Sequence, residues 1–232
     1  MTSYFLYETW TSKNSSLQIN GFECYNFYRL YQNRRAKWSS GGVVLNIRNS
    51  IAKGIDIVKN HHDSIIWIKL RKCFFNFDSD IFVAGIYVWP ENSSMYNVAD
   101  VDLFSLLETD VNHFKNIGIV FLAGDLNART GTRRDYIICD SMDDDEYSPD
   151  VQSNRLSMDK GRNSHGLKLL DLCKANSFRI ANGRLSDNID CFTYVSTTGS
   201  SVIDYLVLHE HDFHYIHSFS IGSFCEWSDH AP

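Results

Sequence analysis

The chain has 232 residues, of which 44% are hydrophobic and 14% are aromatic. This composition is typical of a globular protein with a sizeable core, and it excludes a disordered chain. The formal net charge of −6 argues against binding nucleic acid by bulk attraction. It does not exclude a nuclease, because clustered carboxylates can hold a divalent cation that attracts phosphate.

The cysteines are scattered along the chain, with no C-x-x-C pair and no spacing typical of a zinc site. Because no signal peptide is found either, we expect reduced thiols in an intracellular protein of the nucleus or the cytoplasm. No apolar run approaches the length of a membrane span, so we expect no membrane partner. The six cysteines are Cys24, Cys73, Cys139, Cys173, Cys191 and Cys225.

Short apolar or alternating runs predict strands along most of the chain. Residues 100–114 predict a helix with one apolar face, and residues 164–175 predict another whose first turn Ser164 can cap. Residues 132–159 predict a loop, and the acidic run 143–146 within it is best explained as solvated. This pattern predicts a single α+β domain. The predicted strands are residues 5–7, 25–30, 42–47, 65–70, 81–88, 117–122, 178–181, 192–195, 202–208 and 216–221.

The most informative segment is Gly124-Asp125-Leu126-Asn127, directly after the apolar run 117–122. A buried strand followed by glycine delivers Asp125 and Asn127 side by side at the carboxyl end of the strand. That is where an α/β protein keeps its chemistry. An Asp beside an Asn can hold a water with one group and a phosphate or metal with the other. A polar turn between a strand and a loop is the alternative interpretation.

Other residues suited to chemistry also stand at the ends of predicted strands. Glu8 and Tyr87 each close a short apolar run, and Asp204 lies in a third one, where a carboxylate is costly to bury without a partner or a task. Asp229 and His230 form an Asp-His pair. Structural alternatives remain: Asp204 satisfied by backbone donors, Tyr87 as a core aromatic, and His230 as an exposed side chain.

In the order Glu8, Tyr87, Asp125-x-Asn127, Asp204 and Asp229-His230, these residues resemble the endonuclease/exonuclease/phosphatase superfamily. They are most similar to the apurinic-like endonuclease domain of non-LTR retrotransposons. The resemblance covers nearly all of the chain and includes the stretch Ile-Ala-Asn-Gly-Arg at 180–184. It implies a four-layer αββα sandwich, the DNase I-like fold, over residues 1–232. The first strand of the family, with its Asn, and the last one are expected to be missing, which implies truncation at both ends.

The resemblance also implies metal-dependent chemistry with Mg²⁺, or Mn²⁺ in its place. Glu8 would be the main metal-binding carboxylate, with Asp229 near it. Asp125 would orient and deprotonate the attacking water, and Asn127 would hydrogen-bond the phosphate.

Two further roles follow from the resemblance. His230 would contact a non-bridging phosphate oxygen, with Asp204 on its other ring nitrogen, a pairing that fixes the ring and favours its charged form. Tyr87 would act near the phosphate or the leaving group.

The function expected from the resemblance is a DNA endonuclease that nicks one strand by attack of water on phosphate. DNA would be the substrate, a reverse transcriptase domain would follow in a longer parent protein, and the chain would be monomeric. One alternative is a catalytically inactive remnant that binds nucleic acid or protein. Another is a phosphatase or phosphodiesterase of the same fold, which the missing Trp-Cys-Asp-Arg signature of inositol phosphatases disfavours.

Residues 209–217 contain four histidines and look like a zinc cluster. They do not match H-E-x-x-H, and they lie in the connector between two predicted strands, where polar residues are expected. We therefore interpret them as a polar connector.

Overall fold

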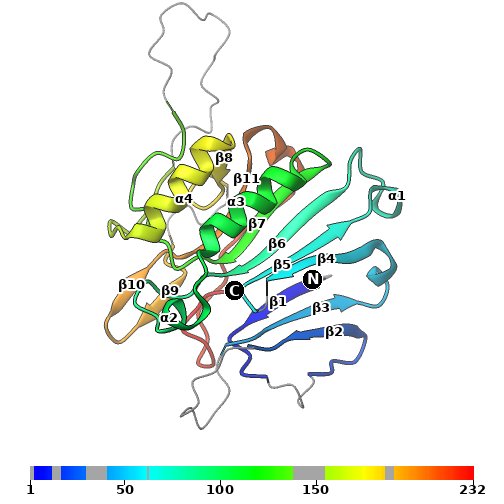
Figure 1. Ribbon diagram of the computed structural model, residues 1–232, viewed down its shortest axis with the longest axis horizontal. Coiled ribbons are helices and arrows are strands. Elements are labelled where there is room, and N and C mark those ends of the chain that lie inside the picture. Colours follow the sequence, from blue (N-terminus) through cyan, green and yellow to red (C-terminus); the bar gives the residue numbers. More distant parts are fainter. Residues whose placement is uncertain (1–2, 12–16, 30–40, 62, 138–154, 186–190) are drawn as a thin grey trace, which may run out of the picture. The chain divides into compact units, whose positions relative to one another are not determined.

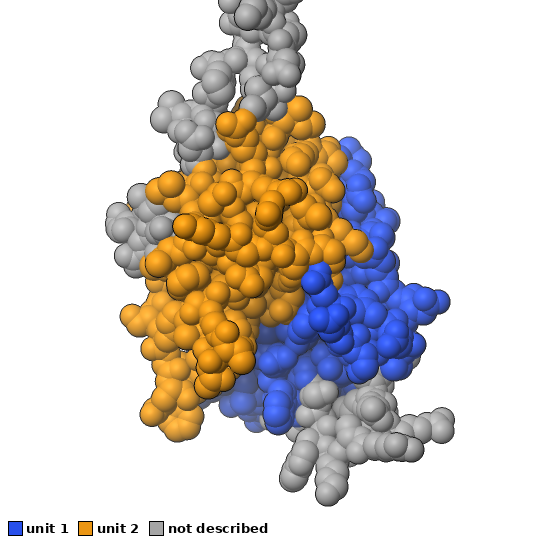
Figure 2. Space-filling view, turned by 90° about the vertical axis from the view of Figure 1, so that its left-hand side faces the viewer, with its two compact units in different colours: residues 1–121 blue, residues 122–232 orange. Residues whose placement is uncertain are grey.

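A computed structural model describes residues 3–11, 17–29, 41–61, 63–137, 155–185 and 191–232 (Figure 1). The described residues form many strands and a few helices, which confirms the α+β class. The chain divides into two compact units, Met1–Phe121 and Leu122–Pro232 (Figure 2). Cys139 and the acidic run 143–146 lie outside the described residues.

The first sheet of unit 1 contains β1 (Ser3–Tyr7), β3 (Val43–Arg48) and β2 (Phe22–Phe27), with β3 in the middle and both pairings antiparallel. The first five residues of β3 are buried. Leu45 and Ile47 stand two residues apart, so they lie on one face of the strand, and both belong to a hydrophobic cluster. This cluster anchors the sheet whose edge strand leads to Glu8.

Three more antiparallel strands follow in unit 1, β4 (Ile55–His61), β5 (Ile65–Leu70) and β6 (Ile81–Tyr87). β5 has its predicted bounds, and its first four residues are buried. β4 was not predicted, because its second half carries exposed polar side chains that mask the strand pattern. The short helices of this unit are η1 (Ala52–Gly54), α1 (Lys72–Phe75) and α2 (Met95–Ala99).

Helix α3 (Leu103–Phe114) buries one face, as its apolar spacing predicts. It begins later than predicted because Asp102 caps it, its carboxylate accepting from two backbone N–H groups of the first turn. At the other end the Phe114 ring packs against Trp67 of β5 and Phe82 of β6, each at a centroid distance of 4.6 Å. These contacts attach the helix to the strands.

Strand β7 (Ile119–Asp125) enters unit 2 at Leu122 and has β11 (Asp204–His209) as its neighbour there. On its other side β11 pairs antiparallel with β8 (Phe178–Ile180). The strand predicted at 117–122 therefore starts and ends later, and Asp125 is its last residue.

Helix α4 (Ser164–Ala175) has its predicted bounds. Its N-cap is Asn163 rather than the predicted Ser164, because the side-chain oxygen Oδ1 of Asn163 accepts from the backbone N–H of Gly166 at 2.8 Å. This one-residue difference matters for the site, since Asn163 has further partners there.

The last part of unit 2 is built around the hairpin of β9 (Tyr194–Ser196) and β10 (Gly199–Ser201), of which β10 was not predicted. The end of the chain lies along β9, with the Val195 N–H donating to the Asp229 carbonyl at 2.9 Å. The strand predicted at 216–221 is wrong, because these half-buried or exposed residues follow the 3-10 helix η2 (Glu210–Tyr215) without strand pairing in the described residues.

None of the helices in the described ranges is long and apolar enough to cross a membrane.

Candidate active site

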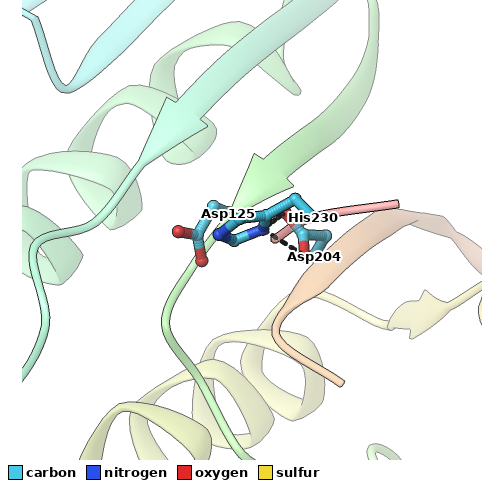
Figure 3. A group of neighbouring side chains, drawn as sticks. All are labelled: Asp125, Asp204 and His230. Carbon is cyan, nitrogen blue, oxygen red and sulfur yellow. Dashed lines mark hydrogen bonds and ion pairs between the residues drawn. The ribbon is translucent and has the colours of Figure 1, made fainter. Parts of the chain in front are cut away.

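Three side chains from distant parts of unit 2 come together (Figure 3). Asp125 is the last residue of β7, Asp204 is the first of β11, and His230 lies beside β9 near the end of the chain. Their ligand-type atoms lie within 4.8 Å of one another. Asp125 is 4% exposed, whereas the other two residues are half-buried. The group therefore has one buried carboxylate next to a solvent-accessible imidazole.

The orientation of His230 is set by Asp204. The ring Nδ1 lies 3.1 and 3.0 Å from the two carboxylate oxygens of Asp204. A carboxylate accepts only from a protonated nitrogen, so Nδ1 carries the hydrogen and Nε2 is directed away from Asp204. The Tyr194 ring packs against the imidazole at a centroid distance of 4.9 Å and limits its rotation.

The backbone around Asp204 is fixed by two buried polar side chains that the sequence did not reveal as important. Thr193 Oγ1 accepts from the N–H groups of Ile203 at 3.0 Å and Asp204 at 3.1 Å. Asn182 Nδ2 donates to the Asp204 carbonyl at 3.0 Å. Asn182 falls in the stretch 180–184 that contributed to the family resemblance, whereas no local pattern points to Thr193.

Asp125 and Asn127 lie side by side. Asp125 Oδ1 accepts from the Asn127 backbone N–H at 2.8 Å, and Oδ2 accepts from Asn127 Nδ2 at 2.9 Å. Asn127 has a φ of +47°, a left-handed conformation that asparagine tolerates better than most residues. The tight turn keeps both polar side chains at the end of the strand.

Asn163 stabilises this turn through side-chain hydrogen bonds. Its Nδ2 donates to the Asn127 carbonyl at 2.8 Å, and its Oδ1 accepts from the Arg129 N–H at 2.8 Å as well as capping α4. Asp159 binds the Arg129 guanidinium through both oxygens, at 2.9 and 2.6 Å. Burial raises the pKa of Asp159, but Arg129 and two backbone N–H donors more than offset this and lower it. The carboxylate is thus a charged support for the turn.

In unit 1, Glu8 and Tyr87 form a pair. The Tyr87 hydroxyl donates to Glu8 Oε1 at 2.5 Å, and its ring stacks on Tyr7 at a centroid distance of 6.4 Å. Glu8 is exposed and has a φ of +50°, directly after β1. Tyr87 is 5% exposed, so its hydroxyl is the polar end of a core aromatic.

A buried carboxylate supports the segment that follows Glu8. Asp63 accepts from Arg29 Nε at 2.9 Å and from the Gly42 N–H at 3.3 Å. The Gly42 carbonyl in turn accepts from the Thr9 N–H at 3.2 Å. Gly42 has a φ of +89°, which explains the glycine at this position.

The predicted site residues thus form two groups: Asp125, Asn127, Asp204 and His230 in unit 2, and Glu8 with Tyr87 in unit 1. Asp229 is exposed beside His230. A metal site shared by Glu8 and Asp229 stays a prediction. Among the described residues, the group whose geometry could hold a metal ion is Asp125, Asp204 and His230.

The histidine-rich segment 209–217 has ordinary structural contacts. Glu210 forms an ion pair with Arg179, and His214 Nδ1 hydrogen-bonds the His211 carbonyl at 2.7 Å. The pKa of His209 is lowered, and burial of the imidazole is the largest cause of this shift. These contacts are made by residues of the 3-10 helix η2, which follows β11.

No family model and no curated protein matches the chain. Solved structures do match. An AP endonuclease from Leishmania major has a TM-score of 0.69 at 12% identity, covering 99% of this chain and 76% of that one. A 3′ phosphatase from Neisseria bound to product DNA hairpin has a TM-score of 0.60 at 12% identity, covering 99% and 86%. The endonuclease domain of TRAS1, a telomere-specific non-LTR retrotransposon, has a TM-score of 0.51 at 15% identity, covering 90% and 75%.

These likenesses define the fold. The chain has the DNase I-like fold, as its ordered motifs predicted. Among solved structures it is similar to AP endonucleases and to a retrotransposon endonuclease domain.

Proposed function

We propose that the protein is a metal-dependent phosphodiesterase that cleaves DNA, and more specifically an endonuclease of the retroelement type that nicks one strand. The observation that carries this proposal is the Asp125–His230–Asp204 group beside Asn127, in a fold whose solved examples include nucleases. In this proposal the protein is a monomer of the nucleus or cytoplasm, and a reverse transcriptase domain accompanies it in a longer parent.

Phosphodiester hydrolysis requires an activated water, neutralisation of the developing charge and a stabilised leaving oxygen. Asp125 orients and deprotonates the water, since it is a buried carboxylate at the strand end. Asn127 hydrogen-bonds the phosphate, and its bond to Asp125 couples the two tasks. His230 acts as an imidazolium: its Nδ1–H is directed to Asp204, and its Nε2–H donates to a non-bridging oxygen.

The donors fit a hard divalent cation. Glu8 is exposed and offers carboxylate oxygens, the ligands that Mg²⁺ and Mn²⁺ prefer, and Asp229 would add another. When bound, the cation supplies charge neutralisation at the phosphate. Tyr87 fixes the Glu8 carboxylate by donating to Oε1. In this proposal Tyr87 also acts near the phosphate or the leaving group.

Nicking of supercoiled plasmid, with Mg²⁺ and with a chelator, tests the proposal. Wild type should convert supercoiled to open circular DNA with Mg²⁺ alone, and Asp125→Ala and His230→Ala should each lower the rate by about 10²–10⁴-fold. Circular dichroism of each variant checks the fold. Unchanged nicking by Asp125→Ala would refute the mechanism. Phosphate release from a 3′-phosphorylated oligonucleotide without nicking would support the phosphatase alternative, and DNA binding without either reaction would support the inactive remnant.

The metal is tested by binding. Glu8→Gln removes one negative charge but keeps the shape of the side chain, so Mn²⁺ affinity measured by titration calorimetry should fall relative to wild type. Glu23→Gln, at another exposed glutamate of unit 1, is the matched control and should leave affinity unchanged. Equal affinity of wild type and Glu8→Gln would place the cation elsewhere.

A further inference from the structure

A basic surface lies next to the turn of Asp125 and Asn127. It is formed by two segments of unit 2, residues 129–137 and 155–163, that run side by side. Thr130 and Arg162 form an antiparallel bridge, and the Asn163 N–H donates to the Arg129 carbonyl at 3.2 Å. One arginine ties the segments further, because Arg155 donates to Thr130 Oγ1 at 2.9 Å and to the Gly131 and Arg133 carbonyls at 3.0 and 3.2 Å.

The exposed charge of these two segments is entirely positive. Their only two carboxylates, Asp135 and Asp159, are 0% and 3% exposed and are each bound by an arginine, Arg184 and Arg129 respectively. Their exposed cations are Arg133, Arg134, Lys160 and Arg162, which we call the basic surface. None of these four forms an ion pair with a carboxylate in the described part of the chain.

This concentration of charge stands out in a chain of net charge −6. A chain with a negative total attracts a polyanion only where its cations are gathered and its acids are withdrawn. Arginine, which supplies three of the four cations, presents a planar fork that matches phosphate oxygens.

The two segments that carry the basic surface are joined directly to the turn of Asp125 and Asn127. Asn163, next to Arg162 in the chain, donates to the Asn127 carbonyl, and Arg129 follows Asn127 by two residues. The basic surface is therefore carried by the segments that support this turn, on the side from which a strand bound at Asp125 and Asn127 can be contacted by unit 2 outside the site itself.

We propose that the basic surface binds the phosphates of the DNA strand that flanks the bond to be cut. The inference rests on the proposed nuclease function and adds where the substrate lies. The contacts are to the backbone, so they hold DNA in place without reading its sequence. An acidic protein segment is the competing occupant, since Ile137, Leu156 and Met158 are also exposed in these segments and would contact apolar side chains of such a partner.

The test is the salt dependence of DNA binding by the full chain, measured by fluorescence anisotropy of a short mixed-sequence duplex with Ca²⁺ in place of Mg²⁺. In the variant Arg133→Gln/Arg134→Gln/Lys160→Gln/Arg162→Gln, the slope of log K against log salt should become shallower. Each phosphate contact contributes about 0.9 to that slope, so four contacts correspond to about 3.6. The matched control is Arg48→Gln/Lys53→Gln/Lys72→Gln/Lys115→Gln, which removes the same charge from exposed cations of unit 1.

Equal changes in both variants would mean that net charge alone matters and would overturn the proposal. A normal slope in the first variant would also overturn it, while leaving the nuclease function intact if wild type still nicks plasmid. Leu156→Ser/Met158→Ser should bind DNA like wild type, and a loss of DNA binding comparable to that of the first variant would contradict a surface that works through phosphates.

A small substrate separates the surface from the chemistry. Hydrolysis of bis(4-nitrophenyl) phosphate with Mn²⁺ needs no flanking phosphates, so the first variant should keep the wild-type rate while its nicking of plasmid falls. A parallel loss on both substrates would show that the substitutions damage the site and would overturn the proposal. If wild type neither hydrolyses these substrates nor binds DNA, the proposed function itself is refuted.

Discussion

The imidazole of His230 depends on one neighbour for its orientation. Asp204→Asn keeps the size of that neighbour but replaces the carboxylate that accepts from Nδ1 with an amide that can present its own N–H instead. We expect single-turnover nicking to fall by about 10²-fold or more, because the ring loses both its fixed tautomer and the adjacent charge. Asp171→Asn, at an exposed aspartate of α4, should nick like wild type. A normal rate for Asp204→Asn would show that His230 needs no orienting carboxylate.

Asn163 offers a sharper separation of roles, because its two polar atoms serve different purposes. Asn163→Asp keeps an acceptor for the N–H groups of Gly166 and Arg129 but loses the donation to the Asn127 carbonyl. We expect the free energy of unfolding to change little and nicking to fall at least tenfold. Asn163→Ala should in addition lose about 0.5–2 kcal/mol of stability, since it removes the cap.

Urea unfolding and nicking assays on the same preparations test these expectations for Asn163→Asp and Asn163→Ala. If Asn163→Asp nicks like wild type, the residue is a helix cap and not a positioning residue for Asn127.

Sequence reasoning at this scale found the residues that follow apolar runs and missed those that act by holding backbone groups through hydrogen bonds. Asp125 and Asn127 stood out because a buried strand delivers them. Asn163, Thr193 and Asp63 did not, since the groups they bind are brought to them by the fold rather than by sequence spacing.

Helix α3 is attached to its strands by one buried carboxylate as well as by apolar packing. Asp110 is 1% exposed and accepts from Lys59 Nζ, from His61 Nε2 at 2.8 Å and from Trp67 Nε1 at 2.8 Å. Asp110→Ala leaves the buried indole N–H of Trp67 without its acceptor, so stability should fall by about 1–3 kcal/mol in urea unfolding. Thr109→Ala, one residue away and exposed, should stay within about 0.5 kcal/mol of wild type. Equal stabilities of the two variants would show that apolar packing alone holds α3.

Helices and strands with a clear apolar periodicity could be predicted from the sequence, and those without one could not. Helix α4 and strand β5 had their predicted bounds because apolar periodicity marks them. Strand β4 was missed because half of it is polar and exposed, and its identity depends on pairing with β5. The run 216–221 alternates like a strand, but without a paired neighbour the alternation does not produce one.

At the scale of the whole molecule, acid should destabilise unit 2 through the pair of Asp135 and Arg184, whose side chains are both 1% exposed. Burial, the largest cause, raises the pKa of Asp135, but the hydrogen bonds and charge of Arg184 more than offset it and lower the pKa below 3.8. Between the lowered pKa of the folded state and pH 3.8, Asp135 binds a proton in the unfolded chain but not in the folded one. The stabilisation is therefore fully present above pH 3.8 and is lost as the pH falls through the lower pKa of the folded state.

Urea midpoints measured from neutral pH downwards check this. Wild type should be more stable than Asp135→Asn at neutral pH, and the difference should shrink below pH 3.8. A difference that is constant across the titration would mean that the carboxylate contributes by shape and hydrogen bonding alone.

The largest prediction made from the sequence is that Glu8, Tyr87, Asp125, Asn127, Asp204, Asp229 and His230 act in one cleft. It depends on the order of the motifs, and it unites a pair in unit 1 with a group in unit 2. A double-mutant cycle tests it in solution with Glu8→Gln and Asp125→Asn. Residues that serve one transition state are strongly non-additive, so the double variant should nick about as slowly as the slower single variant. Multiplication of the two single effects would mean that Glu8 and Asp125 act independently, and the single cleft would have to be abandoned.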